Sequence, residues 1–99
     1  MKRFVVGTNR TSDVQDKVFL TLIRARFPRL GWWHQLSEIW LFVDPSDSVS
    51  CIDLRDVATK AFPDIKLIVL EATGFPNLWA GFGQQEEYDW MASNWDANE

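Results

Sequence analysis

The fold is decided by residues 31–43, GWWHQLSEIWLFV, in which two apolar runs flank the polar pair Ser37-Glu38. The second run, residues 39–43, has the length of a strand and is rich in the β-branched and aromatic residues that strands favour. Two such runs joined by a short polar connection are typical of a β-hairpin. The sequence therefore predicts two adjacent antiparallel strands in the middle of the chain.

On the N-terminal side of the hairpin, the sequence predicts a strand followed by a helix. The strand covers residues 3–6 and ends at the turn-forming residues that follow. Ser12 and Gln15 have the spacing of a capping box, which marks the start of a helix. Apolar residues then recur with helical spacing until Pro28, which ends the helix.

On the C-terminal side, the same pattern of helix and strand follows. Ser50 and Asp53 signal a second helix start, Pro63 ends that helix, and residues 65–70 form a fourth apolar strand. The predicted order is β-α-β-β-α-β, the order of an α+β fold with a ferredoxin-like antiparallel sheet. We expect a single domain over residues 1–99.

The predicted domain has a core over residues 3–74 and a C-terminal extension over residues 75–99. In the extension, the aromatic segment at residues 78–82 predicts an extra short strand, and the apolar spacing of residues 88–95 predicts a terminal helix.

The strands of the predicted sheet are apolar on both faces, because their side chains alternate in direction and both sets are apolar. Two helices cover only one face of a four-stranded sheet. We expect a second copy of the chain to cover the other face, with the terminal segment of the same chain as the competing cover. The expected interface residues, with the first two placed on the face away from the helices, are Trp40, Phe42, Ile68, Leu70, Trp79 and Phe82.

Charge and composition restrict the classes of partner. The formal net charge is −4, and residues 84–99 carry five acids and no base, so the surplus of Lys and Arg that phosphate binding requires is missing. Cys51 is the sole cysteine and has no partner for an internal disulfide. No apolar run approaches the roughly 20 residues that span a bilayer. We expect a cytoplasmic protein with no membrane partner.

Three motifs resemble a family of small bacterial proteins labelled SinR-like: a WWH…W hairpin at residues 32–40, an E-x-T-G end to the fourth strand at residues 71–74, and a W-x-G-F segment at residues 79–82. That family is similar to the small CRISPR adaptation protein and to the virulence-associated D endoribonucleases. The resemblance implies a ferredoxin-like homodimer. It also implies a nuclease fold in which an Asp at the end of the first strand of each subunit holds metal.

In this sequence, the position of that Asp corresponds to Thr8, and a neutral hydroxyl is by itself a poor ligand for Mg²⁺. We therefore expect a dimeric binding or scaffold protein without efficient nuclease activity and without a cofactor. Two alternatives remain. One is a metal-dependent endoribonuclease of toxin type that uses Mg²⁺ or Mn²⁺, and the other is a protein that sequesters a small ligand or nucleotide.

His34 is the sole histidine, so no zinc site of His and Cys ligands can form within one chain. With Thr8 it is the candidate catalytic pair, and His34 would act as a general acid or base. Alternatively, its ring packs between tryptophans and one hydrogen bond from it fixes the hairpin.

A ligand or nucleic-acid site is predicted where basic residues accompany an aromatic ring. Its residues are Asn9, Arg10, Arg24, Arg26 and Trp33. Arginines that hold phosphates beside rings that stack on bases are typical of proteins that bind single strands. The alternative is that these cations only favour the C-terminus of an exposed helix.

Overall fold

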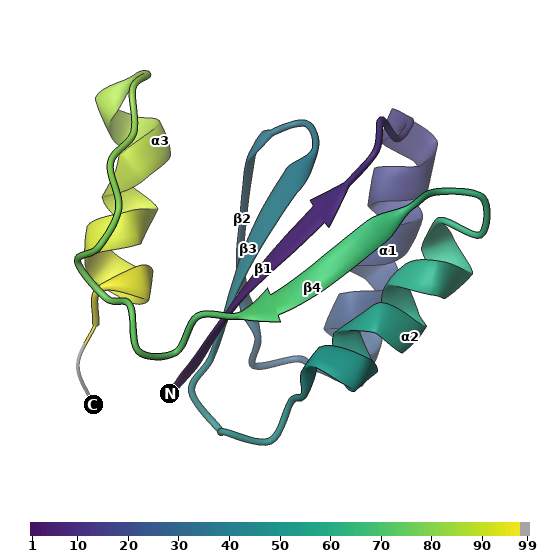
Figure 1. Ribbon diagram of the computed structural model, residues 1–99, viewed down its shortest axis with the longest axis horizontal. Helices are drawn as coiled ribbons and strands as arrows, with labels where there is room; N and C mark the ends of the chain where they lie inside the picture. The colour runs from purple at the N-terminus through teal and green to yellow at the C-terminus, as the bar shows by residue number, and fades with distance from the viewer. Residues whose placement is uncertain (98–99) are drawn as a thin grey trace.

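The computed structural model describes residues 1–97 and shows an α+β fold (Figure 1). Its elements are β1 (Lys2–Thr8), α1 (Asp13–Arg26), β2 (Gly31–Leu36), β3 (Ile39–Asp44), α2 (Cys51–Ala61), β4 (Leu67–Glu71), α3 (Gln85–Trp90) and a π-helical turn, η1 (Met91–Trp95). The predicted β-α-β-β-α-β order is confirmed, and a terminal helix follows it. The predicted extension runs to residue 99, and its last two residues lie outside the described part.

The four strands form one antiparallel sheet in the order β2-β3-β1-β4, which is compatible with a ferredoxin-like arrangement. Both predicted helix starts are confirmed: Ser12 with Gln15, and Ser50 with Asp53, form complete capping boxes. Each box satisfies backbone N–H groups that a helix start otherwise leaves without partners. These local signals fix where the two long helices begin.

The larger core lies between the sheet and the helices α1 and α2. Trp40 and Phe42 of β3 are 1% and 0% exposed there, and Phe19 of α1 packs edge-on against both rings, with centroids 5.1 and 5.9 Å away. The expectation that Trp40 and Phe42 lie on the face away from the helices is therefore wrong. The alternation of side chains separates these two residues from Leu41 but does not tell which face of the sheet the helices cover. Because both rings are buried under the helices, neither is free for an interface between copies.

The terminal segment covers part of the opposite face of the sheet. In Figure 1 it lies on one side of the sheet, while α1 and α2 lie on the other. Met91 and Trp95, both 4% exposed, form a second small core with Val43 of β3. The competing prediction, a cover from the same chain, is thus correct for this part of the face.

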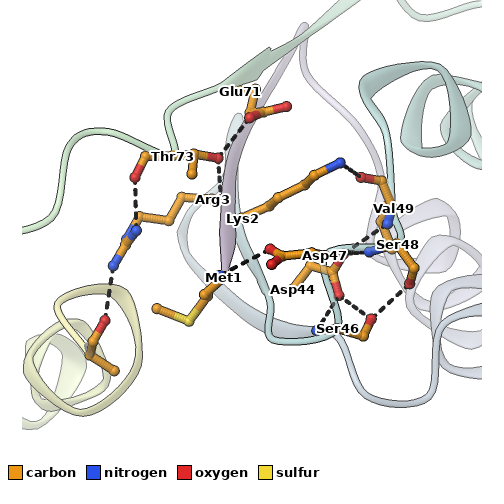
Figure 2. A network of polar contacts seen from close by, with 11 residues as sticks. Met1, Lys2, Arg3, Asp44, Ser46, Asp47, Ser48, Val49, Glu71 and Thr73 are labelled. Carbon is orange, nitrogen blue, oxygen red and sulfur yellow. Dashed lines mark hydrogen bonds and ion pairs between the residues drawn. The ribbon is translucent and has the colours of Figure 1, made fainter. Parts of the chain in front are cut away.

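Arg3 holds the terminal segment to β1 (Figure 2). Its guanidinium is buried and donates to the carbonyl oxygens of Thr73 (2.8 Å), Trp95 (2.5 Å) and Ala97 (2.9 Å). A cation at this end of a helix also favours its dipole. The side chain of Arg3 in β1 thereby holds the end of η1 in place.

The predicted short strand in the extension is wrong, since residues 72–84 contain turns and bends but no strand. Trp79 instead stacks on Tyr88, and its indole N–H bonds to the Asp96 carboxylate at 3.1 Å. These contacts fold the segment onto α3. Among residues 1–97, no helix is long and apolar enough to cross a membrane.

Candidate functional site

His34 and Thr8 lie on the helix side of the sheet, at the end where the β2–β3 hairpin turns. The His34 ring stacks on Trp40, with ring centroids 3.7 Å apart and planes 7° from parallel. Its Nδ1 donates to the carbonyl oxygen of Ile39 at 3.0 Å, and its Nε2 is 3.4 Å from the Asp16 carboxylate. Each ring nitrogen thus has a partner within the fold, and the Nδ1 bond to Ile39 is of the kind that the structural alternative for His34 predicts, a hydrogen bond within the hairpin.

Asp16 belongs to the first turn of α1 and extends this chain of contacts, because the Thr11 hydroxyl donates to its other oxygen at 2.7 Å. The contacts link the start of α1 to the hairpin. They hold the His34 ring in one orientation, which leaves little freedom for a general acid or base to reach a substrate.

The Thr8 Oγ is buried and has no hydrogen-bond partner among the described residues. Beside it lies an open depression of about 510 Å³, which Asn9, Glu38 and Lys66 also line. Glu38 is the one acid in that lining. Within residues 1–97 no group of three or more His, Cys, Asp or Glu side chains is placed to hold a metal ion.

The predicted ligand site does not assemble as one surface. Trp33 points to the far face of the sheet, which is the face away from α1 and α2. There it is 6% exposed, and its indole N–H donates to the Glu87 carbonyl oxygen at 2.6 Å. It is therefore covered by the terminal helix and cannot stack on a base. The prediction missed this because adjacent residues of a strand, here Trp32 and Trp33, point to opposite faces.

The arginines of that predicted site have separate surroundings. Arg24 lies over the Trp32 ring, 5.8 Å from its centroid, and Arg26 is 3.6 Å from the Asp53 carboxylate. Arg10, like Asn9, is exposed and precedes α1, whereas Arg24 and Arg26 end it. A helix of 14 residues spans about 21 Å, so the cations form no single patch.

Cys51 begins α2, but its surroundings do not activate the thiol. Burial raises its pKa, and the nearby carboxylate of Glu71 raises it further, which outweighs the effect of Lys2. A thiol with a raised pKa is a weak nucleophile at neutral pH.

Ile68 and Leu70 are the exposed apolar residues of β4. They lie 58% and 52% exposed on the far face, beside Gly7 and Val5 of β1. The terminal segment leaves this part of the face uncovered. Of the six predicted interface residues, these two remain available, together with the partly exposed Trp79 and the fully exposed Phe82.

A second apolar surface lies between the terminal segment and the far face of the hairpin. This cleft has a volume of about 350 Å³, and Leu36, Ile39, Trp79, Phe82 and Tyr88 are among its lining residues. The polar atoms of its rings are already paired, because the Tyr88 hydroxyl donates to the Phe82 carbonyl oxygen and Trp79 bonds to Asp96. The cleft therefore presents apolar surface and aromatic faces.

Sequence reasoning missed Arg3 and Asp16 as organising residues. For Arg3 a signal was present: it alternates with Phe4 and shares its face with Val5, so a charge stands on a face that is otherwise apolar. Such a charge implies that another segment supplies its partners. A scan of protein-family models, a search of curated proteins and a search of solved structures each found no match to this chain.

Proposed function

We propose that this protein is a small dimeric binding or scaffold protein with a ferredoxin-like fold, similar in architecture to the CRISPR-adaptation-like superfamily, and that it lacks efficient nuclease activity. The observation that carries the proposal is the exposed pair Ile68 and Leu70 on an edge strand that the terminal segment leaves bare. Soluble monomers seldom leave contiguous apolar surface open to water. A second copy would remove it.

The residues at the end of β1 support the absence of efficient cleavage. A metal-dependent endoribonuclease needs carboxylates that hold Mg²⁺ or Mn²⁺, and Thr8 stands where the resemblance implies an Asp. Both ring nitrogens of His34 already have partners, Ile39 for Nδ1 and Asp16 for Nε2. Neither residue is poised to activate a nucleophile.

The dimer is tested by native mass spectrometry and light scattering at tens of micromolar protein. We expect a mass of twice 11.5 kDa for the wild-type chain. Ile68→Glu places like charges near the two-fold axis and should give a folded monomer. Val14→Glu is the matched control, because Val14 is an exposed aliphatic residue of α1, away from β4. A wild-type monomer under these conditions would exclude the proposal.

Nuclease activity is tested with labelled single-stranded RNA in the presence of Mg²⁺ or Mn²⁺. We expect no cleavage above that of the variants Asp13→Ala, Asp16→Ala and His34→Ala. Metal-dependent cleavage by the wild-type protein that one of these variants abolishes would establish the endoribonuclease alternative instead.

The apolar cleft favours a second candidate function, sequestration of a small ligand. A concave apolar surface with aromatic walls is a common form of small-molecule site, and this one has the volume for a ligand of a few fused rings. Since it offers no phosphate-binding group, the ligand would be apolar or aromatic rather than a nucleotide.

This candidate is tested with the apolar dye 8-anilinonaphthalene-1-sulfonate and by native mass spectrometry of the protein as purified. We expect saturable dye binding that Leu36→Glu weakens at least about tenfold, because a charge in the cleft costs desolvation. Leu78→Glu is the control, as Leu78 is exposed outside the cleft lining. Equal dye binding by both variants would exclude the cleft as the site.

A further inference from the structure

We propose that β4 pairs edge to edge with β4 of a second copy, antiparallel about a two-fold axis at Val69, so that the two sheets become one. The inference rests on the proposed dimer and assigns its contact surface. It differs from packing of two sheet faces, because the main contact is made by backbone groups along the strand.

The outer edge of β4 presents unused backbone groups. The Asn9 N–H donates to the Lys66 carbonyl oxygen at 3.0 Å, and the Ala72 N–H donates to the Arg3 carbonyl oxygen at 2.7 Å. In an antiparallel ladder, alternate residues point to the same neighbour, so even-numbered residues of this strand bond to β1. Leu67, Val69 and Glu71 therefore direct their N–H and C=O groups outward. Cys51 lies in the groove between α2 and β4, near the Glu71 end of this edge.

The two edges of the sheet differ in their protection. At the β2 edge, the register shifts between Trp33 and Leu36, and such irregularities hinder the addition of a strand. β4 has five residues, LIVLE, without proline and without a register shift in its pairing with β1. It thus carries neither a proline nor a bulge, two of the devices that keep an edge strand from pairing with another chain.

Exposed apolar side chains flank the open edge on both sides. Ile68 and Leu70 lie on the far face, and Ile52 of α2, 59% exposed, lies on the helix side. Between α2 and β4 runs a groove of about 300 Å³ lined by Cys51, Ile52, Arg55, Leu67, Ile68 and Val69. A strand added to β4 would place alternate side chains in this groove and against Ile68 and Leu70.

The direction of the backbone groups selects the register. Hydrogen-bonded pairs must join outward-facing residues, and with Val69 on the two-fold axis all five residues of both strands are paired. Leu67 then lies opposite Glu71 of the second copy, and Ile68 lies opposite Leu70 of the second copy. The two exposed apolar residues of each chain become cross-strand neighbours on the far face.

Charge complementarity identifies the occupant as a second copy. Arg55 and Leu67 line the same groove, and in this register Leu67 lies opposite Glu71 of the second copy, so we place Arg55 within reach of that Glu71 on the helix side of the sheet. The two-fold axis produces this ion pair twice. Within its own chain, the exposed Arg55 bonds to its sequence neighbour Asp56 at 3.0 Å, and Glu71 accepts from the Thr73 hydroxyl at 2.8 Å. Both side chains lie at the surface and are placed to meet a partner.

The test uses the two charge reversals Arg55→Glu and Glu71→Arg. Each variant alone brings two like-charged pairs together, and we expect each to dimerise at least about tenfold more weakly than the wild type. When the two variants are mixed, the heterodimer has two opposite-charged pairs, and dimerisation should return to near the wild-type level. Lys60→Glu on the same helix, outside the groove, is the matched control and should leave dimerisation unchanged.

A measurement on the wild type needs no variant. Amide exchange by NMR should slow at Leu67 and Val69 as protein concentration rises, since their N–H groups become bonded only in the dimer. Exchange at Ile68, which bonds to β1 in the monomer, should change less.

The outcomes separate the two proposals. Weak homodimers with a restored mixed dimer, together with protected Leu67 and Val69, support the edge pairing. A wild-type dimer that neither reversal weakens, or whose Leu67 and Val69 amides stay unprotected, overturns the edge pairing and leaves the dimer standing. A monomeric wild-type chain overturns both.

Discussion

Asp44 is a buried carboxylate, 1% exposed, that organises the loop between β3 and α2 (Figure 2). One oxygen accepts from the N–H and hydroxyl of Ser46, at 3.0 and 2.6 Å. The other accepts from the N–H groups of Ser48 and Val49, each at 2.8 Å. Burial alone would raise the pKa of Asp44, but these four donors outweigh it and hold the pKa below the usual value of 3.8.

The lowered pKa of Asp44 predicts a dependence of stability on acid. Because the folded pKa lies below the unfolded one, the stabilisation is present above about pH 4 and is lost as the pH falls through the folded pKa. Asp44→Asn should cost about 2 kcal/mol of unfolding free energy at pH 7, because the NH₂ group of the new amide would face N–H or O–H donors of the loop and leave them without an acceptor. Urea unfolding at pH 7 and pH 3 measures both effects.

The decline between pH 7 and pH 3 should be smaller in Asp44→Asn than in the wild type. Asp64→Asn, at an exposed aspartate, is the control and should decline as the wild type does. If Asp44→Asn loses as much stability with acid as the wild type, Asp44 is not the source of the acid sensitivity.

Two substitutions at His34 separate the contribution of ring stacking to stability from that of the hydrogen bond. His34→Ala removes both the stacking on Trp40 and the bond to Ile39, and should cost about 2 kcal/mol of unfolding free energy. His34→Phe keeps a flat ring on Trp40 and should lose about half as much. Thermal unfolding followed by calorimetry compares the two variants, and equal losses would mean that the ring contributes no stacking energy.

At the scale of elements, the hydrogen bonds of Arg3 predict that the stability of the terminal helix depends on β1. Arg3→Met keeps the apolar stem but leaves the carbonyl oxygens of Thr73, Trp95 and Ala97 without their donor. We expect a loss of about 3 kcal/mol and faster amide exchange throughout α3 and η1, because unpaired buried acceptors are costly.

Lys2→Met is the matched control for Arg3, because Lys2 is adjacent in the same strand but donates to the Val49 carbonyl oxygen. Its effect should be confined to the loop before α2. If Arg3→Met leaves hydrogen exchange in residues 85–97 unchanged, the packing of Met91 and Trp95 alone holds the helix.

The elements differ in how far the sequence predicts them. The capping boxes at Ser12 and Ser50 lie within four residues of sequence, and the helices begin where the boxes indicate. The side of β3 that the helices cover depends on contacts between distant segments, such as Phe19 with Trp40, so alternation alone could not tell on which face Trp40 lies. The position of α3 depends on Arg3, whose acceptors lie at least 70 residues away in the chain.

The candidate site shows the same limit. The pattern WWH singled out His34, but it gave no sign of the partner Asp16, which is 18 residues away on another element. It also suggested that Trp33 would be free to stack, although the strand turns that ring beneath a helix whose sequence begins more than 50 residues later.

At the scale of the whole molecule, charge predicts negligible binding of duplex DNA at physiological salt. The net charge is −4, and Arg10 is separated from Arg24 and Arg26 by the length of α1, about 21 Å. This exceeds the screening length of about 8 Å at that salt, so the cations do not act together on one stretch of phosphates. Gel shifts and fluorescence anisotropy at low micromolar protein measure the binding, and a shifted complex would contradict the prediction.

The acidic terminal segment is the remaining electrostatic element that could mask weak binding. Deleting residues 84–99 is a poor test of that role, because the deletion also uncovers Trp33 and Val43 on the sheet. Glu86→Gln with Asp89→Asn removes two exposed charges and keeps the helix. Because the cations stay dispersed after these substitutions, we expect no duplex binding by this variant either. Binding by the double variant alone, lost again in high salt, would instead identify α3 as an electrostatic shield over a weak phosphate-binding surface.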